Sequence, residues 1–403
     1  MSCHELHLRR RRRMSCGAPA AAAVAVALCA PAWPANWEIA PRVEAGYRYN
    51  DNHRLDQPGE EVEVSGAEVD ARATFRTIDP RTTFEITPRV RATHFPDERD
   101  EDYTDYLLSG LFQDVTPRRR VGVRAEATRE TVVRSELPDP ELDGELGVPD
   151  DPDSGRVRER ADRDLLRVAP FFSYALSERY LVQFDASLLD ASYSGASRGA
   201  YQDFNEYNLG AGVGVQTSER SSVLLRAFGS RYETTFDSEG YGAELRWTTD
   251  FSPTSRAYVS LGGQQTERDG GESQSGLVGG LGGRWTSQRN EFFIDLMRSV
   301  RAIGAGTIVE RHQLRLGIDH AVSPRLGLQL AVRANRDEEL EDVGTYPTRE
   351  YASAQAGLEW RWTRFVSLRA TYNYYWQEYE DEPSDASANS FLIGLVYEPK
   401  RRD

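Results

Sequence analysis

Apolar and polar residues alternate along most of this chain, and this period of two restricts its fold more than any other feature. In the first alternating segment the apolar face is formed by Trp37, Ile39, Val43, Ala45, Tyr47 and Tyr49. The polar face of that segment is formed by Glu38, Arg42, Glu44 and Arg48. Successive side chains of a β-strand point to opposite faces, so the pattern predicts a strand with one apolar and one polar face.

The alternation recurs as far as Tyr397, in segments that include 84–92, 121–128, 206–215, 241–247, 326–333, 366–376 and 391–397. Two kinds of connection separate the segments. The short ones resemble one another and lie at 79–81, 116–118, 177–179, 217–220, 252–256, 287–289, 323–325 and 363–364. The others are mostly longer and often acidic, and lie at 51–63, 96–102, 133–162, 194–200, 269–273, 338–347 and 381–387. Short turns at one end and longer loops at the other are typical of an outer-membrane barrel.

We therefore predict an all-β fold, a transmembrane antiparallel up-and-down β-barrel of about 18 strands (16–18), formed by residues 36–403. An unpaired backbone amide in hydrocarbon costs several kcal/mol, so a sheet in a membrane has to close on itself. The first strand near Trp37 is expected to pair with the last strand near Tyr397. Almost no uninterrupted apolar run follows residue 32, which excludes a bundle of membrane-spanning helices.

The main alternative to a membrane barrel is a soluble all-β protein. Only 39% of the residues are hydrophobic, which suits a barrel because every second strand residue faces its interior. Aromatic residues also gather near strand ends, where a membrane interface favours them. The candidate interface aromatics are Trp37, Tyr47, Tyr49, Trp247, Trp285, Trp360, Trp362, Tyr374, Trp376 and Tyr397.

The first 35 residues are expected to be a secretory signal peptide. A basic block at 9–13 precedes an apolar stretch at 18–28 and the small-residue pattern Ala30-Pro31-Ala32. The apolar stretch is too short to span a bilayer. The cysteines Cys3, Cys16 and Cys29 all lie in this segment, so the exported chain is expected to have no disulfide and no thiolate site. Met14 is a second candidate start.

The polar faces of the strands predict a charged inner wall. The candidate lumen-lining residues are Arg42, Glu44, Arg48, Arg89, Arg91, Arg124, Glu126, Arg167, Glu206, Arg226, Glu244, Arg246, Arg315, Arg333, Glu359, Arg361 and Arg369. Charges of both signs keep a bore hydrated, and arginine binds carboxylates through two parallel hydrogen bonds. The simpler interpretation is that these charges pair across strands. We expect them both to pair in this way and to keep the bore hydrated.

No catalytic or metal site is predicted, and we do not expect an enzyme. The histidines His53, His94, His312 and His320 are scattered, without the spacing of a zinc site. The acidic runs at 97–102, 150–153 and 337–342 carry carboxylates of the kind that bind Ca²⁺. Their spacing matches no defined Ca²⁺ loop, so solvated loops are the simpler interpretation. The segment 133–162 is expected either to fold into the pore as a plug or to stay outside it.

Two short motifs resemble the β-barrel porin 2 group of outer-membrane proteins. They are Ala45-Gly46-Tyr47-Arg48-Tyr49-Asn50-Asp51-Asn52 and Glu101-Asp102-Tyr103-Thr104-Asp105-Tyr106. The resemblance covers nearly all of the exported chain as architecture. It implies a role in passing polysaccharide across the outer membrane, because members often accompany exopolysaccharide export systems. One departure is the end of the chain, where residues 398–403 follow the aromatic Tyr397.

We therefore expect a hydrated conduit for polysaccharide in the outer membrane of a Gram-negative cell. The alternatives are a general or small-solute porin, and a structural or adhesive barrel that acts through acidic extracellular loops. Short turns are expected in the periplasm and long loops outside. The expected partners are outer-membrane lipid, lipopolysaccharide, exported polysaccharide and periplasmic export proteins. Nucleic acid is excluded by the net charge of −15, and no cofactor is expected.

Overall fold

The computed structural model describes residues 37–399, apart from 78, 138–155, 158, 198, 270, 272 and 341–345. The predicted signal peptide, residues 1–35, and the acidic run 150–153 lie outside the described residues. No helix in the described part of the chain is long and apolar enough to cross a membrane.

Eighteen strands make up nearly all of the described structure. The first nine are β1 (Trp37–Asn50), β2 (Val64–Thr77), β3 (Thr82–His94), β4 (Tyr103–Val115), β5 (Arg119–Thr131), β6 (Asp162–Ala175), β7 (Tyr180–Ser194), β8 (Phe204–Ser218) and β9 (Ser221–Glu233). The second nine are β10 (Asp237–Ser252), β11 (Ser255–Arg268), β12 (Ser273–Thr286), β13 (Asn290–Ala302), β14 (Ile308–Ser323), β15 (Leu326–Glu339), β16 (Arg349–Arg361), β17 (Val366–Tyr379) and β18 (Ala386–Tyr397). Two short helices interrupt the connections, η1 (Arg99–Glu101) and α2 (Val132–Glu136).

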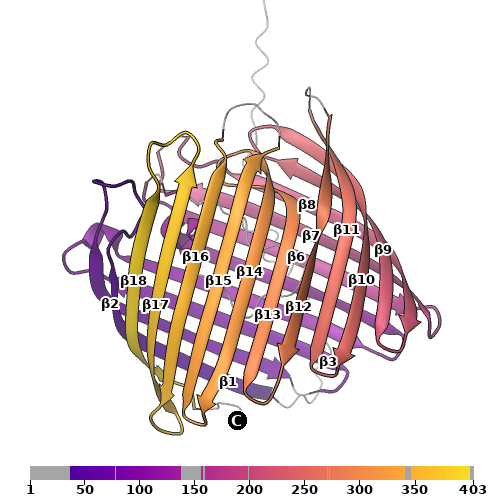
Figure 1. The fold of residues 1–403 in the computed structure, drawn as a ribbon, viewed down its shortest axis with the longest axis horizontal. Helices are drawn as coiled ribbons and strands as arrows, with labels where there is room; N and C mark the ends of the chain where they lie inside the picture. Colours follow the sequence, from indigo (N-terminus) through magenta and orange to yellow (C-terminus); the bar gives the residue numbers. More distant parts are fainter. Residues whose placement is uncertain are drawn as a thin grey trace, which may run out of the picture. The chain divides into compact units, whose positions relative to one another are not determined.

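The sheet closes into a barrel. Every strand pairs antiparallel with its sequence neighbours, and β1 also pairs with β18. In Figure 1 the yellow last strand therefore lies beside the indigo first strands. The predicted antiparallel barrel of about 18 strands and the pairing of first and last strands are confirmed. The register differs in detail, because Tyr397 lies opposite Val43 rather than Trp37. Such a stagger is required when tilted strands close into a barrel.

The alternation places large apolar side chains on the outside of the barrel. Leu209 is 67% exposed and Leu261 is 65% exposed. Residues of the opposite parity point inward, as Tyr351 and Tyr375 show by packing against Leu55 from the β1–β2 connection. A face of exposed leucines around a closed sheet is what a lipid environment stabilises and water does not.

The short connections form one rim, which we call the turn end, and their similar sequences have a structural cause. In each of them a Ser, Thr or Asp side chain accepts hydrogen bonds from backbone N–H groups two or three residues later. Asp79 accepts from Arg81 at 2.8 Å, and Ser177 accepts from Arg179 at 3.2 Å. The same side-chain caps occur at Thr116, Ser218, Ser252, Ser287, Ser323 and Thr363. These caps satisfy turn donors that no strand partner reaches.

The opposite rim, the loop end, contains one correction. The acidic run 337–342 was expected to be a loop, but β15 continues to Glu339. Asp337 points inward and is fully buried between Arg311 and Arg349. The alternation of β15 simply continues through this run, and two inward arginines stabilise the carboxylate there.

The closing seam leads to a prediction about assembly. Gly46 and Gly394 lie opposite each other on β1 and β18. A Cβ atom on Gly46 would lie 2.6 Å from the Ile393 carbonyl oxygen, and one on Gly394 would lie 2.8 Å from that of Ala45. We expect Gly46→Val to destabilise the closed barrel by about 1–3 kcal/mol, because the strands would have to separate. The loss should appear as a smaller folded fraction in heat-modifiable gel mobility.

The matched control for this prediction is Gly327→Val on β15. A Cβ atom at Gly327 would meet nothing within 4 Å, so this variant should fold as well as the wild type. Equal folded fractions for the two variants would contradict the close approach at the seam.

Candidate functional site

The inner wall of the barrel carries the charged side chains. The structure places all of the candidate lumen residues on strand positions that alternate with the exposed apolar ones, namely Arg42, Glu44, Arg48, Arg89, Arg91, Arg124, Glu126, Arg167, Glu206, Arg226, Glu244, Arg246, Arg315, Arg333, Glu359, Arg361 and Arg369. Several of them are ion-paired. Arg167 lies 3.6 Å from Glu126, and Arg246 lies 3.4 Å from Glu244.

One ion pair and one hydrogen bond of these residues cross the closing seam between β1 and β18. Arg48 of β1 donates two hydrogen bonds to Glu68 of β2 and one of 3.1 Å to Ser390 of β18. Arg369 of β17 donates to Glu44 of β1 at 3.1 Å and thereby spans β18. Forked contacts of arginine with carboxylates fix orientation as well as charge, so the inner charges also hold the first and last strands together.

Sequence reasoning missed most of the carboxylates that neutralise the inner arginines. Asp337 accepts from Arg311 at 2.6 and 2.7 Å and from Arg349 at 3.4 Å. Asp70 accepts from Arg89 at 3.0 Å, and Asp295 accepts from Arg315 and Tyr258. Their parity within each strand would have revealed them, because each sits two or four residues from other inward polar positions.

One row of inner arginines is only partly neutralised. Arg42, Arg72 and Arg89 lie directly opposite one another on β1, β2 and β3. Arg42 lies 3.3 Å from Glu44, and Arg89 is paired with Asp70. Arg72 is exposed on the inner wall and makes no ion pair within 4.0 Å among the described residues. This residue was not among the predicted lumen positions, and it gives the bore a positive site.

The loop end of the bore is narrowed by three connections that fold inward. We call their contact the inner loop cluster. It comprises Leu55, Val132, Leu137, Val157, Ala161 and Tyr201, packed against Tyr351, Tyr375, Ala386 and Ala388 of the inner wall. The wall residues belong to β16, β17 and β18, whereas Val132 and Ala161 flank the β5–β6 connection. The described residues Val132, Leu137, Val157 and Ala161 therefore pack inside the barrel. Residues 138–155 of the same connection lie outside the described residues, and their predicted placement stays open.

Ion pairs, hydrogen bonds and ring contacts stabilise the inner loop cluster. Arg156 is ion-paired with Glu382, and its guanidinium lies 4.8 Å from the ring centre of Tyr379. Tyr201 stacks on Tyr193 with ring centres 4.9 Å apart. The hydroxyl of Tyr193 donates a 3.0 Å hydrogen bond to the buried carboxylate of Glu136 in α2. Stacked rings and satisfied charges give this narrowing a defined structure rather than a loose filling.

The β1–β2 connection contributes a buried histidine to the same region. His53 is 5% exposed, and its ring lies 5.5 Å from that of Phe95. Burial, together with the neighbouring cations Arg48, Arg134 and Arg54, lowers the pKa of His53 from 6.5 to about 3. His53 is therefore neutral when docked. The next residue but one, Leu55, has a φ of 57°, and Gln377 of β17 donates a 2.8 Å hydrogen bond to its carbonyl oxygen.

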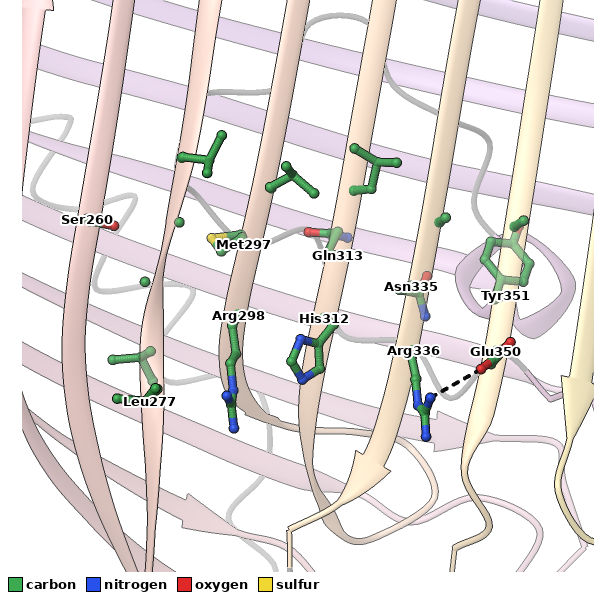
Figure 2. A pocket seen from close by; sticks show the side chains of 18 of the residues that line it. Ser260, Leu277, Met297, Arg298, His312, Gln313, Asn335, Arg336, Glu350 and Tyr351 are labelled. Carbon is green, nitrogen blue, oxygen red and sulfur yellow. Dashed lines mark ion pairs between the residues drawn. The ribbon is translucent and has the colours of Figure 1, made fainter.

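A hollow of about 770 Å³ lies across β11–β17, and it is a second candidate site. Figure 2 shows Arg298, His312, Arg336 and Glu350 along one edge of it, on four adjacent strands. These charges already pair, because Arg298 donates to Glu310 at 2.7 Å and Arg336 lies 3.5 Å from Glu350. Much of the remaining lining consists of exposed leucines of the outer face. The hollow therefore adds no solute site to the inner wall.

The histidines and the carboxylates are not arranged for metal chemistry. His94 is hydrogen-bonded to Asp102, while His312 and His320 lie on the outward face of β14. Within the part of the chain that the structure describes, no group of three or more His, Cys, Asp or Glu side chains could hold a metal ion.

The candidate interface aromatics fall into two groups. Trp37, Trp247, Trp285, Trp360, Trp362 and Tyr397 lie toward the turn end. Tyr47, Tyr49, Tyr374 and Trp376 lie toward the loop end. The aromatics that belong to strands occupy the alternate positions that face outward, and Trp362 follows β16 directly.

No protein-family model and no curated protein matches this sequence. Among solved structures the chain is similar to OpdO of Pseudomonas aeruginosa, with 10% identity and a TM-score of 0.47 over 90% of this chain and 97% of the other. It is similar to OpdQ of the same organism, with 9% identity and a TM-score of 0.46 over 90% and 98%. It is also similar to the P. aeruginosa outer membrane protein OpdK, with 10% identity and a TM-score of 0.45 over 90% and 99%. Values this low carry no argument about function, and the resemblance to the β-barrel porin 2 group stays a prediction.

The environment of His53 predicts that the β1–β2 connection undocks in acid. A released histidine takes up a proton near pH 6.5, whereas the docked one does so only near pH 3. Docking therefore weakens as the pH falls from 6.5 toward 3, by roughly a hundredfold at pH 4.5. A nitroxide on Glu60→Cys, an exposed position of this connection, should become more mobile over that range in its spin-resonance spectrum.

The control is His53→Gln in the same labelled chain, because glutamine does not titrate. Nearby carboxylates such as Glu68 and Glu101 are present in both proteins, so the difference between the two pH curves isolates the histidine. Identical curves would contradict the buried, neutral His53.

Proposed function

We propose that this chain is an outer-membrane channel for small hydrophilic solutes. The observation that carries the proposal is the opposite character of the two faces of a closed sheet. Exposed leucines and aromatics cover the outside, and paired charges cover the inside. A wall of this kind excludes lipid from its interior and holds water there, which is the requirement for passive passage of polar molecules.

The inner loop cluster supports small solutes over a polymer. The β1–β2, β5–β6 and β7–β8 connections all contribute to it, through Leu55, Val132 and Tyr201, and they pack on the wall of β16–β18. A polysaccharide chain would have to pass a segment held by ion pairs and stacked rings. A small solute needs only a gap beside this segment.

The row of Arg42, Arg72 and Arg89 supports a preference for anionic solutes. A carboxylate or phosphate passing this level of the bore would meet the exposed guanidinium of Arg72, which has no carboxylate within 4.0 Å among the described residues. Arginine binds such groups with two donors in one plane. The paired arginines beside it add positive potential without closing the site.

The proposal is tested by reconstituting the purified barrel in a planar bilayer. A steady conductance in simple salt, without any partner protein, is the expected result. A barrel that inserts but does not conduct would favour the structural or adhesive alternative. Loss of surface polysaccharide on deletion of the gene, together with absent conductance, would favour the export role instead.

Arg72→Gln should reduce the preference for anions. We expect the anion-to-cation permeability ratio, taken from reversal potentials in a salt gradient, to fall roughly two- to fivefold, as for one charge acting across a few ångströms of water. The matched control is Arg231→Gln, which removes the same charge from an exposed outward position of β9. A ratio that stays unchanged in Arg72→Gln, or falls equally in both variants, would reject the arginine row as the selective element.

A further inference from the structure

Every one of the eight connections at the turn end carries an arginine. These residues are Arg81, Arg118, Arg179, Arg220, Arg256, Arg289, Arg325 and Arg364, and all of them are exposed. Only three acidic residues lie within the same connections, Asp79, Glu178 and Glu219. The turn end is thus positive although the chain as a whole has a net charge of −15. We call the eight residues the arginine collar.

The side-chain caps of the turns fix the position of the collar. Six of the arginines directly precede the first residue of a strand, as Arg179 precedes β7 and Arg325 precedes β15. The capping Ser, Thr or Asp accepts either from the backbone N–H of the arginine itself, as Ser323 does from Arg325 at 3.2 Å, or from that of the next residue, as Thr116 does from Arg119 at 3.0 Å. Arg256 and Arg364 lie within two residues of the same position. The fold therefore presents one cation at an equivalent height on each hairpin, around the whole perimeter.

Within the described residues, half of the collar arginines make no side-chain hydrogen bond, ion pair or cation–π contact. Arg81 is paired with Asp114 at 2.8 Å, and Arg256 with Asp250 at 2.6 Å. Arg220 donates to the carbonyl oxygen of Phe251 at 3.3 Å, and Arg364 lies over the ring of Phe365. The remaining four, Arg118, Arg179, Arg289 and Arg325, have no side-chain hydrogen bond or ion pair there.

An aromatic band lies next to the collar on the side of the barrel wall. Exposed rings at this level include Trp37, Trp285, Trp360, Trp362, Phe251 and Phe365. Tryptophan prefers the boundary between hydrocarbon and headgroups. An arginine one step farther from the hydrocarbon reaches the level of lipid phosphates, while its methylene groups stay against the apolar surface.

We propose that the arginine collar binds the phosphate groups of anionic phospholipids in the membrane leaflet at the turn end. This inference rests on the proposed membrane location. A lipid leaflet surrounds a barrel on all sides, and the collar likewise repeats on every hairpin. A protein partner would contact one sector only, and nothing in its binding would require the same residue at all eight turns.

The test uses the tryptophans as reporters of lipid identity. The described tryptophans other than Trp376 lie toward the turn end, so brominated lipid at that rim quenches most of the emission. The full barrel is reconstituted in phosphatidylcholine containing a small fraction of brominated phosphatidylglycerol or of brominated phosphatidylcholine. Wild-type protein should bind the anionic lipid about fivefold better than the zwitterionic one, the effect of one arginine near an anionic surface. The preference should shrink as salt is raised.

The test variant replaces Arg118, Arg179, Arg289 and Arg325 together with glutamine. Its control replaces four exposed arginines toward the loop end, Arg99, Arg129, Arg231 and Arg336, with the same change in net charge. The collar variant should lose most of the preference for the anionic lipid, and the control should keep the wild-type ratio. Equal binding of both lipids by the wild type, or equal losses in the two variants, would overturn the collar.

A conductance recording on each preparation separates this proposal from the channel itself. If the barrel conducts but shows no lipid preference, lipid binding by the arginine collar is rejected and the channel function is retained. If the barrel shows the lipid preference but does not conduct, the channel function is rejected and lipid binding by the collar is retained.

Discussion

The structure depends on one closed ladder of backbone hydrogen bonds. A sheet with an open edge cannot exist in hydrocarbon, because each unpaired amide there costs several kcal/mol. Pairing of β1 with β18 removes that edge, and it also separates an inside from an outside. The close approach of Gly46 to Gly394 and the arginines that reach across the seam serve this one contact. The opposite character of the two faces has functional meaning only because the ladder closes.

Once an interior exists, its charges have to be compensated. A buried charge without a partner is strongly destabilising, and the inner wall follows this rule, as the placement of Asp337 between two arginines shows. The same rule explains the neutral His53 among cations. Against this background the exposed Arg72 differs from its neighbours, because no carboxylate lies within 4.0 Å of it among the described residues. A charge solvated only by water can exchange that water for an anionic solute at little cost.

Period-two alternation predicted the barrel, its approximate strand number and which charged residues alternate with the exposed apolar ones, since each of these follows from local sequence. It did not single out β2, whose outward face uses the small residues Ala67, Ala71 and Ala73, and so Arg72 was missed. The alternation also could not predict the inner loop cluster. The cluster joins residues far apart in the chain, such as Leu55 and Tyr375, and composition alone does not determine which loop turns inward. The prediction of a loop at 337–342 was wrong for a related reason. A run of acidic residues indicates a solvated loop only where no inward-facing cation lies near enough to pair with it.

The two rims of the barrel are built on different principles, and this difference separates their roles. At the turn end, a side chain two or three residues away caps each turn in the same way, and an arginine recurs in all eight turns. At the loop end, each connection makes contacts of its own, as the stack of Tyr201 on Tyr193 illustrates. A rim made of similar units suits a partner that is the same in every direction, which a lipid leaflet is. A rim made of unlike units can shape a single opening, which is what discrimination between solutes requires.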